Sequence, residues 1–153
     1  MNSLTFDSPI GLLTLIGTGE ALTSICFDTP GYPFNPSPLL LKALSELREY
    51  FAGERREFDI PLAPEGTEFQ QKVWKALEEI PYGETRSYGE IAQAVGSPRA
   101  ARAVGLANNK NPIPIMIPCH RVIGADGAMT GYAGGVENKQ FLLKLEKKHK
   151  KRK

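Results

Sequence analysis

The sequence has few of the residues that hold metal ions or form disulfides. Among its 153 residues there are two cysteines, Cys26 and Cys119, and two histidines, His120 and His149. A structural zinc site needs about four such ligands at short spacing, and these residues are scattered, so we expect no metal. A disulfide between the two cysteines is conceivable on composition alone, but a reducing cytoplasm argues against it.

Long apolar runs are also missing. No stretch approaches the roughly 20 apolar residues that a membrane-spanning helix requires. The N-terminal sequence MNSLTFDSPIGLLTLIGTGE has no basic segment, and its apolar residues alternate with polar ones, unlike those of a signal peptide. We therefore expect a cytoplasmic protein without membrane contact.

Charge is small overall and uneven along the chain. The formal net charge is +2, yet residues 1–65 carry nine acids and four bases, whereas residues 66–153 carry eight acids and fifteen bases. A basic half predicts a polyanionic partner. Much of the excess lies in the tail KLEKKHKKRK, for which a solvated terminus and a DNA contact are equally good interpretations.

The first third of the chain has the pattern of a strand meander followed by a helix. Apolar residues alternate in three short stretches within residues 2–28, separated by the turn sequences SPIG and GTGE. The stretch LLLKALSELREYFAGE then places Leu40, Leu44, Leu47 and Phe51 at helical spacing and is predicted to end at Gly53.

After the linker-like sequence PLAPEGTE the pattern becomes mainly helical. Thr67 is predicted to cap a helix that buries Phe69, Val73, Leu77 and Ile80 beside a core residue, Trp74. An amphipathic helix, ENKQFLLKLEKK, closes the chain. We predict an α+β protein with a strand-rich N-terminal domain, including the linker, at residues 1–65 and a mainly helical domain at residues 66–153.

Two short helices on either side of Gly96, Ser97 and Pro98 predict a helix-turn-helix. Ser97 is expected to cap the second helix, with Pro98 in its first turn. That helix carries small residues and polar side chains suited to phosphates and base edges, so DNA binding is one interpretation and an alanine-rich core helix the other. The polar side chains are Arg99, Arg102, Asn108, Asn109 and Lys110.

The stretch NPIPIMIPCHRV places Cys119 directly before His120 and Arg121. A cysteine beside cationic groups is poised to become a thiolate, which is the reactive form. The prolines at positions 112, 114 and 118 predict a rigid, extended segment, on which neighbouring side chains point to opposite sides. His120 would then act on Cys119 through a water or a bend, with Glu146 as a candidate to orient the imidazole. A buried structural cysteine is the alternative.

These stretches, in order RSYGEIA, AARAVG, NPIPIMIPCHRVIG and GYAGG, resemble the O6-alkylguanine-DNA alkyltransferases, also called methylated-DNA–protein-cysteine methyltransferases. The resemblance is strong from about Phe69 to Glu146, and the first third resembles the family in shape. It implies a DNA repair protein that flips an O6-alkylated guanine out of double-stranded DNA and moves the alkyl group to its own cysteine. Such a protein acts once, without a cofactor, and we expect a monomer.

The resemblance also implies a role for individual residues. Cys119 matches the alkyl acceptor, His120 its base, and Glu146 the carboxylate that orients the histidine. Asn111 matches the brace of the active-site turn, and Tyr88 the proton donor to the leaving guanine. Arg102 matches the arginine that enters the duplex; further DNA contacts are expected at Ser97, Arg99, Ala101, Gly105 and Asn109. The base pocket is expected to comprise Tyr88, Val122, Met129, Tyr132 and Ala133, with Ala133 where some members have a serine.

Two other functions compete with this prediction. An alkyltransferase-like protein that only recognises lesions would lack the reactive cysteine, whereas Cys119 is present. A Cys-His hydrolase would turn over repeatedly and would leave the DNA-reading features unexplained.

Overall fold

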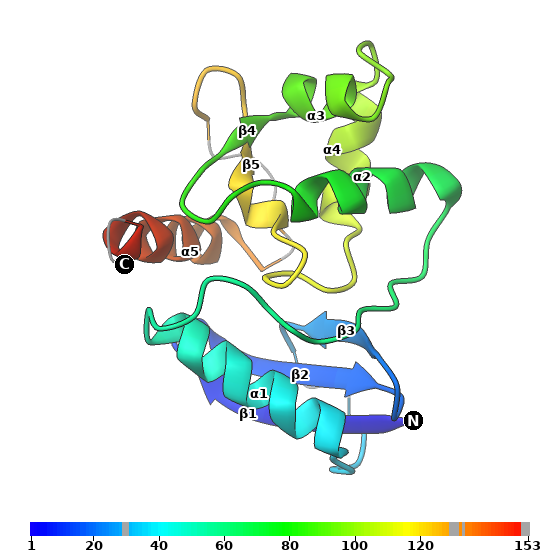
Figure 1. Cartoon of the computed structure of the whole chain (residues 1–153), viewed down its shortest axis with the longest axis vertical. Coiled ribbons are helices and arrows are strands. Elements are labelled where there is room, and N and C mark those ends of the chain that lie inside the picture. The colour runs from blue at the N-terminus through cyan, green and yellow to red at the C-terminus, as the bar shows by residue number, and fades with distance from the viewer. Residues whose placement is uncertain (29–30, 129–131, 133, 151–153) are drawn as a thin grey trace. The chain divides into compact units, whose positions relative to one another are not determined.

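The computed structural model describes residues 1–28, 31–128, 132 and 134–150 (Figure 1). The chain divides into two compact units, Met1–Glu65 and Gly66–Lys153. The first contains a three-stranded antiparallel sheet and a helix, and the second is mainly helical, so the predicted α+β class is confirmed. Within the described ranges, no helix is long and apolar enough to cross a membrane.

The sheet of the first unit is the predicted meander. Its strands are β1 (Asn2–Ser8), β2 (Gly11–Gly17) and β3 (Leu22–Cys26), paired in that order. Phe6 lies opposite Leu13, and Leu15 lies opposite Ile25. Because side chains alternate along a strand, this register puts these four apolar side chains on one buried face.

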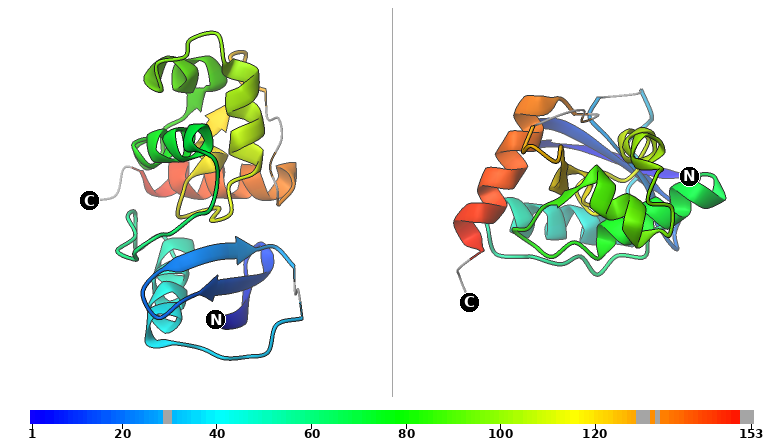
Figure 2. Two further views of the ribbon diagram at one scale, coloured as in Figure 1. Left: turned by 90° about the vertical axis from the view of Figure 1, so that its right-hand side faces the viewer. Right: turned by 90° about the horizontal axis from the view of Figure 1, so that it is seen from above.

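Helix α1 (Pro38–Phe51) covers one face of this sheet (Figures 1 and 2). The Ser37 hydroxyl accepts a hydrogen bond from the Leu40 N–H at 3.1 Å, and Pro38 occupies the first turn, where its missing N–H costs nothing. The helix ends at Phe51, two residues before the predicted Gly53, which follows it in a left-handed conformation.

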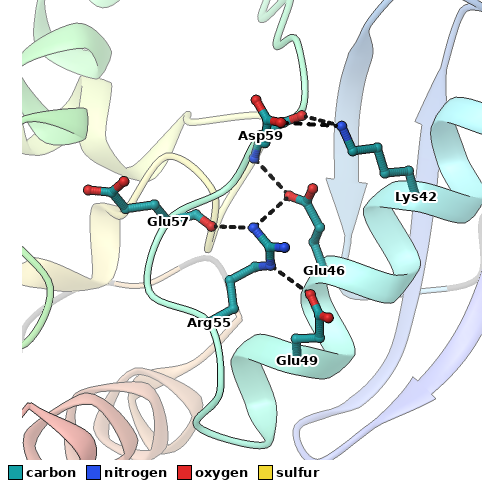
Figure 3. A network of polar contacts seen from close by, with 6 residues as sticks. All are labelled: Lys42, Glu46, Glu49, Arg55, Glu57 and Asp59. Carbon is teal, nitrogen blue, oxygen red and sulfur yellow. Dashed lines mark hydrogen bonds and ion pairs between the residues drawn. The ribbon is translucent and has the colours of Figure 1, made fainter. Parts of the chain in front are cut away.

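A polar network fastens the segment after α1 back onto that helix (Figure 3). Buried Glu46 accepts a hydrogen bond from the Asp59 N–H at 2.8 Å and lies 3.8 Å from the Arg55 guanidinium. Arg55 Nε also donates to Glu49 at 2.7 Å. Glu46 therefore supplies the buried acceptor that the backbone of residue 59 requires.

The helices of the second unit are α2 (Glu68–Glu78), α3 (Tyr88–Ala94), α4 (Ala101–Asn109), the short 3₁₀ helix η1 (Cys119–Arg121) and α5 (Val136–His149). Helices α2, α3 and α4 pack together (Figure 2). Strands β4 (Arg86–Ser87) and β5 (Val122–Ile123) form a short parallel pair. This pair brings the start of α3, with Tyr88, beside the residues that follow η1.

Helix α2 has the predicted cap and most of the predicted core: Val73, Trp74 and Leu77 are buried on it, and Ile80 is buried just after its end, whereas Phe69 is only half-buried. The Thr67 hydroxyl accepts from the Gln70 N–H, and the Gln70 side chain accepts from the Thr67 N–H, a reciprocal capping box. Trp74 is buried, and its indole N–H donates to the Ala107 carbonyl at 2.8 Å. The bond ties α2 to the last turn of α4.

The predicted start of α4 at Ser97 is wrong. The helix begins at Ala101, and Ala100 precedes it without a side-chain cap. The Ser97 N–H donates to the Ala92 carbonyl and the Gly96 N–H to the Gln93 carbonyl, with Gly96 at φ 79°. This is the Schellman arrangement that ends a helix at a glycine. The Ser97 N–H therefore belongs to the C-terminal cap of α3, and residues 97–100 form the turn between α3 and α4.

Candidate active site

The segment before Cys119 consists of tight turns rather than the predicted extended chain. The Met116 N–H donates to the Pro114 carbonyl at 2.9 Å across Ile115, which has φ 76°. The Cys119 N–H donates to the Ile117 carbonyl at 2.7 Å across Pro118. Such three-residue turns reverse the chain, which fixed proline φ angles alone do not forbid. A left-handed β-branched residue costs about 1–3 kcal/mol, so the surroundings must hold this conformation.

Asn111 supplies part of that support. Its Nδ2 donates to the Ile117 carbonyl at 2.8 Å, and its Oδ1 accepts from the Ile113 N–H at 3.0 Å. Both bonds are buried. One amide thus bridges the two ends of the turn.

Cys119, His120 and Arg121 form η1, so they are not on an extended strand, and the prediction that neighbouring side chains alternate is wrong here. The Arg121 N–H donates to the Pro118 carbonyl at 3.0 Å, which closes the helical turn. All three residues are buried.

Glu146 on α5 receives the side chains of both residues that follow the cysteine. His120 Nε2 lies 2.6 Å from Glu146 Oε2, and Arg121 donates to the same carboxylate from Nε at 2.8 Å and from Nη2 at 3.1 Å. The Gly83 N–H adds a fourth contact at 3.2 Å. Arg121 also donates from Nη1 to the Ile80 carbonyl at 2.7 Å. The carboxylate is therefore fully coordinated by donors.

These contacts define the protonation of His120. Burial raises the pKa of Glu146, but the charges and hydrogen bonds of His120 and Arg121 outweigh burial and lower it. An ionised carboxylate only accepts hydrogen bonds, so Nε2 of His120 must carry its proton. Burial lowers the pKa of His120, and its other ring nitrogen, Nδ1, is buried with no hydrogen-bond partner among the described residues. A neutral ring with a bare Nδ1 is a base that can accept a proton.

The thiol of Cys119 is not poised as a thiolate by its two neighbours, which corrects the expectation from the sequence. Burial raises its pKa to about 11, and Asn111 and the charge of Lys139 lower it only in part. Arg121 makes its hydrogen bonds to Glu146 and Ile80 instead. Proton removal at neutral pH thus needs a base.

Lys139 is a buried lysine that sequence reasoning missed. It lies on the same face of α5 as Leu142 and Glu146, and burial lowers its pKa while Cys119 raises it. Its burial could have been predicted from spacing. Lys139 lies three residues before Leu142 and seven before Glu146, so it falls on the face of an amphipathic helix that packs inward.

Three of the five predicted pocket residues lie in the described part of the chain. Val122 and Tyr132 are buried, and the charge of Cys119 contributes to the raised pKa of Tyr132, after burial. Tyr88 is half-buried at the start of α3. Met129 and Ala133 lie outside the described residues, so the predictions made for them stay predictions.

The predicted DNA contacts are grouped around α4. Arg99, Arg102 and Asn109 are exposed, whereas Ser97, Ala101 and Gly105 are half-buried. A Cβ atom at Gly105 would lie 3.8 Å from the Tyr88 ring, an ordinary contact, so internal packing does not require glycine there. Asn108 is buried, unlike its neighbour Asn109, and cannot contact a surface ligand.

Where the chain is described, no group of three or more histidine, cysteine or acidic side chains is arranged to hold a metal ion. Cys26 and Cys119 are both free thiols.

Comparison with known proteins gives concordant matches for both units. The family model for the DNA-binding domain of 6-O-methylguanine DNA methyltransferase matches residues 68–148, and that for its ribonuclease-like domain matches residues 3–64. The methylated-DNA–protein-cysteine methyltransferase of Methanosarcina acetivorans is 55% identical over 92% of this chain and 95% of its own. That of Methanosarcina mazei is 63% identical over 94% of this chain and 96% of its own.

Solved structures agree with these matches. The crystal structure of Mycobacterium tuberculosis OGT in complex with DNA superposes with a TM-score of 0.91 at 56% identity, covering 97% of this chain and 94% of that one. The O6-methylguanine-DNA methyltransferase of Pyrococcus kodakaraensis, at 26% identity, covers 95% of this chain and 98% of its own with a TM-score of 0.59. With both units matched over nearly their whole length, the chain belongs to the 6-O-methylguanine DNA methyltransferase family.

Proposed function

We propose that this protein repairs DNA by moving the alkyl group from O6 of an alkylated guanine to its own Cys119. The observation that carries the proposal is the buried arrangement of Cys119, His120 and Glu146 in a chain that belongs to this family. Double-stranded DNA containing O6-alkylguanine is the substrate, and each molecule reacts once because the product is a thioether that no group in the site can hydrolyse.

His120 activates the cysteine. The thiol proton passes to His120 Nδ1, directly or through a water. Glu146 then stabilises the resulting imidazolium through its contact with the Nε2–H. Support comes from the bare Nδ1 and from the 2.6 Å contact at Nε2. Because the pKa of Cys119 is about 11, thiolate formation without a base would be rare at neutral pH.

The transfer is an SN2 step at the alkyl carbon. The sulfur–carbon bond forms while the carbon–O6 bond breaks, and the electron pair of that bond stays with guanine. Tyr88 supplies a proton to the leaving guanine. The base must be outside the duplex for the sulfur to reach it, and unstacking costs a few kcal/mol. Val122 and Tyr132 would form part of the pocket that receives it, with Met129 and Ala133.

Helix α4 carries the DNA contacts in this proposal. Arg102 fills the space that the flipped base leaves, while Ala101 and Gly105 let the helix approach the minor groove. Arg99, Ser97 and Asn109 contact the backbone nearby. Support comes from the exposed positions of Arg99, Arg102 and Asn109 on or just before one helix.

We further propose that the protein acts as a monomer in the cytoplasm. All three residues of the Cys119, His120 and Glu146 arrangement come from one chain, so no second copy is required to complete it. A reducing compartment would keep Cys119 as the free thiol that the reaction consumes.

The test is an intact mass measurement after the protein is mixed with a duplex that contains one O6-methylguanine. We expect one added methylene on the peptide that holds Cys119, with loss of one lesion per protein molecule. The Cys119→Ala variant should bind the same duplex and repair none of it. Tight lesion binding without a mass change in the unaltered chain would favour the recognition protein, and many products per molecule would favour a hydrolase.

A further inference from the structure

Asn108 is a buried amide that the proposed mechanism does not use. It lies in the last turn of α4, on the helix face that also buries Val104 and Ala107, and is 2% exposed. Asparagine is a poor helix former, and a buried side-chain amide must find hydrogen-bond partners. Its presence at this position therefore calls for a contact that an apolar residue could not make.

That contact is with the backbone of the nucleophile. Asn108 Nδ2 donates to the carbonyl oxygen of Cys119 at 3.3 Å. The same carbonyl accepts the N–H of Val122, which follows η1. The peptide that leaves Cys119 is thus held from two sides, once by the local turn and once by α4.

Asn111 holds the other side of the nucleophile. It fixes the Ile117 carbonyl, which also accepts the Cys119 N–H, so the chain that enters Cys119 is anchored as well. Asn108 lies in the last turn of α4 and Asn111 two residues beyond its end, and the two amides bracket the cysteine. Between positions 113 and 117 the left-handed Ile115 makes the turn intrinsically unfavourable, so its geometry depends on such external contacts.

We propose that Asn108 is a positioning residue for alkyl transfer: it couples α4 to the Cys119 backbone and keeps the sulfur in line with the alkyl carbon. The inference rests on the proposed function. Small displacements of a nucleophile slow a displacement reaction strongly, because the reacting atoms must be aligned at about 3–3.5 Å. Asn108 acts through the backbone of Cys119 and touches neither substrate nor sulfur in this role.

A second observation separates positioning from stability. Asn108 Oδ1 is buried without a hydrogen-bond partner among the described residues. An unpartnered buried acceptor destabilises a fold, and replacing such a group with an apolar one of similar size is often neutral or stabilising. Asn108→Leu should therefore leave the melting temperature unchanged or higher while the reaction slows.

The experiment is single-turnover methyl transfer by the full chain from an O6-methylguanine duplex, followed at several DNA concentrations. For Asn108→Leu we expect the rate constant at saturating DNA to fall about tenfold or more. The DNA concentration at half-maximal rate should stay within about twofold of the unaltered chain. Gln71→Leu, the same change of amide to leucine on the exposed face of α2, serves as the control and should react at the normal rate.

Asn108→Asp adds a second measurement, because it keeps the size and the acceptor oxygen but removes the donor. If Asn108→Leu transfers methyl groups at the normal saturating rate, the inference is overturned, whatever the result for Asn108→Asp. A loss of DNA affinity with a normal saturating rate would overturn it too, since that pattern belongs to a DNA contact. Failure of the unaltered chain to transfer would overturn the proposed function itself, and the inference with it.

Discussion

His120 Nε2 and Glu146 Oε2 lie 2.6 Å apart with both side chains fully buried. The same carboxylate also compensates the guanidinium of Arg121, which is 7% exposed. One side chain therefore has two functions, because it fixes the tautomer of the proposed base and neutralises a buried cation.

Replacing Glu146 with glutamine should damage both functions. Glu146→Gln leaves the Arg121 charge buried without a counter-ion, and breaking a buried pair in this way costs about 3–5 kcal/mol of unfolding free energy. Methyl transfer should also slow, since a neutral amide stabilises the imidazolium less well. Urea unfolding and single-turnover rates measure the two effects, with Glu137→Gln on the exposed face of α5 as the control.

The stability difference should itself depend on pH. The pKa of Glu146 is lowered in the folded state, so its stabilising effect is present above the ordinary value of 4.5 and is lost as pH falls below it. The difference in unfolding free energy between the unaltered chain and Glu146→Gln should therefore become smaller as the pH falls below 4.5. A gap that stays constant down to pH 3 would contradict the lowered pKa.

The reactivity of Cys119 toward a small reagent should show its raised pKa. Alkylation by iodoacetamide requires the thiolate, so its rate should increase about tenfold per pH unit and continue to increase beyond pH 9. Quantifying the Cys119 peptide by mass spectrometry separates it from Cys26. The unfolded chain should instead level off near the ordinary value of 9.0, and a plateau below pH 9 in the folded chain would disprove the pKa of about 11.

Lys139 should be a measurable electrostatic contributor to that reactivity. Its charge lowers the pKa of Cys119, so Lys139→Met should slow the alkylation of Cys119 at pH 8 by roughly threefold or more. Lys144→Met removes an exposed lysine from the same helix and should have little effect. Equal alkylation rates for Lys139→Met and the unaltered chain, with matching melting curves, would show that the charge of Lys139 does not lower the pKa of Cys119.

In the first unit, Glu46 should matter more than its neighbour Glu49. Glu46→Ala removes the buried carboxylate that accepts the part-buried Asp59 N–H, and a hydrogen bond to a charged group contributes about 1.5–3 kcal/mol. Glu49 is 46% exposed in its ion pair with Arg55, and such pairs contribute at most about 1 kcal/mol. Urea unfolding of the two alanine variants compares them, and a smaller effect for Glu46→Ala would refute the assignment.

Local sequence signals predicted the regular elements well. Thr67 was predicted to cap α2, and Thr67 and Gln70 stand at capping-box spacing, so this helix start depends on residues within one turn. The failure at Ser97 has the same local origin, because a Ser-Pro pair also suits the end of a preceding helix that stops at glycine. Both local rules fit this stretch, and the structure shows that Ser97 takes part in the end of α3.

The site was harder to predict because its contacts join distant segments. Arg121 and Glu146 are 25 residues apart, and only the fold shows that Arg121 compensates a carboxylate instead of the thiol. Asn108 and Asn109 are adjacent and chemically identical, yet one is buried and the other exposed. The sequence analysis grouped both with the polar side chains suited to DNA, because residue type alone does not show which face of the helix packs against the rest of the unit.

The left-handed turn at Ile115 has a consequence for the order of folding. Residues 113–119 have no intrinsic preference for this conformation, so the turn should form only once the end of α4 is in place to hold it. Contacts made late contribute little to the folding transition state, and substitutions that weaken them mainly accelerate unfolding. We therefore expect the nucleophile to reach its working geometry in the last stage of folding and to lose it in the first stage of unfolding.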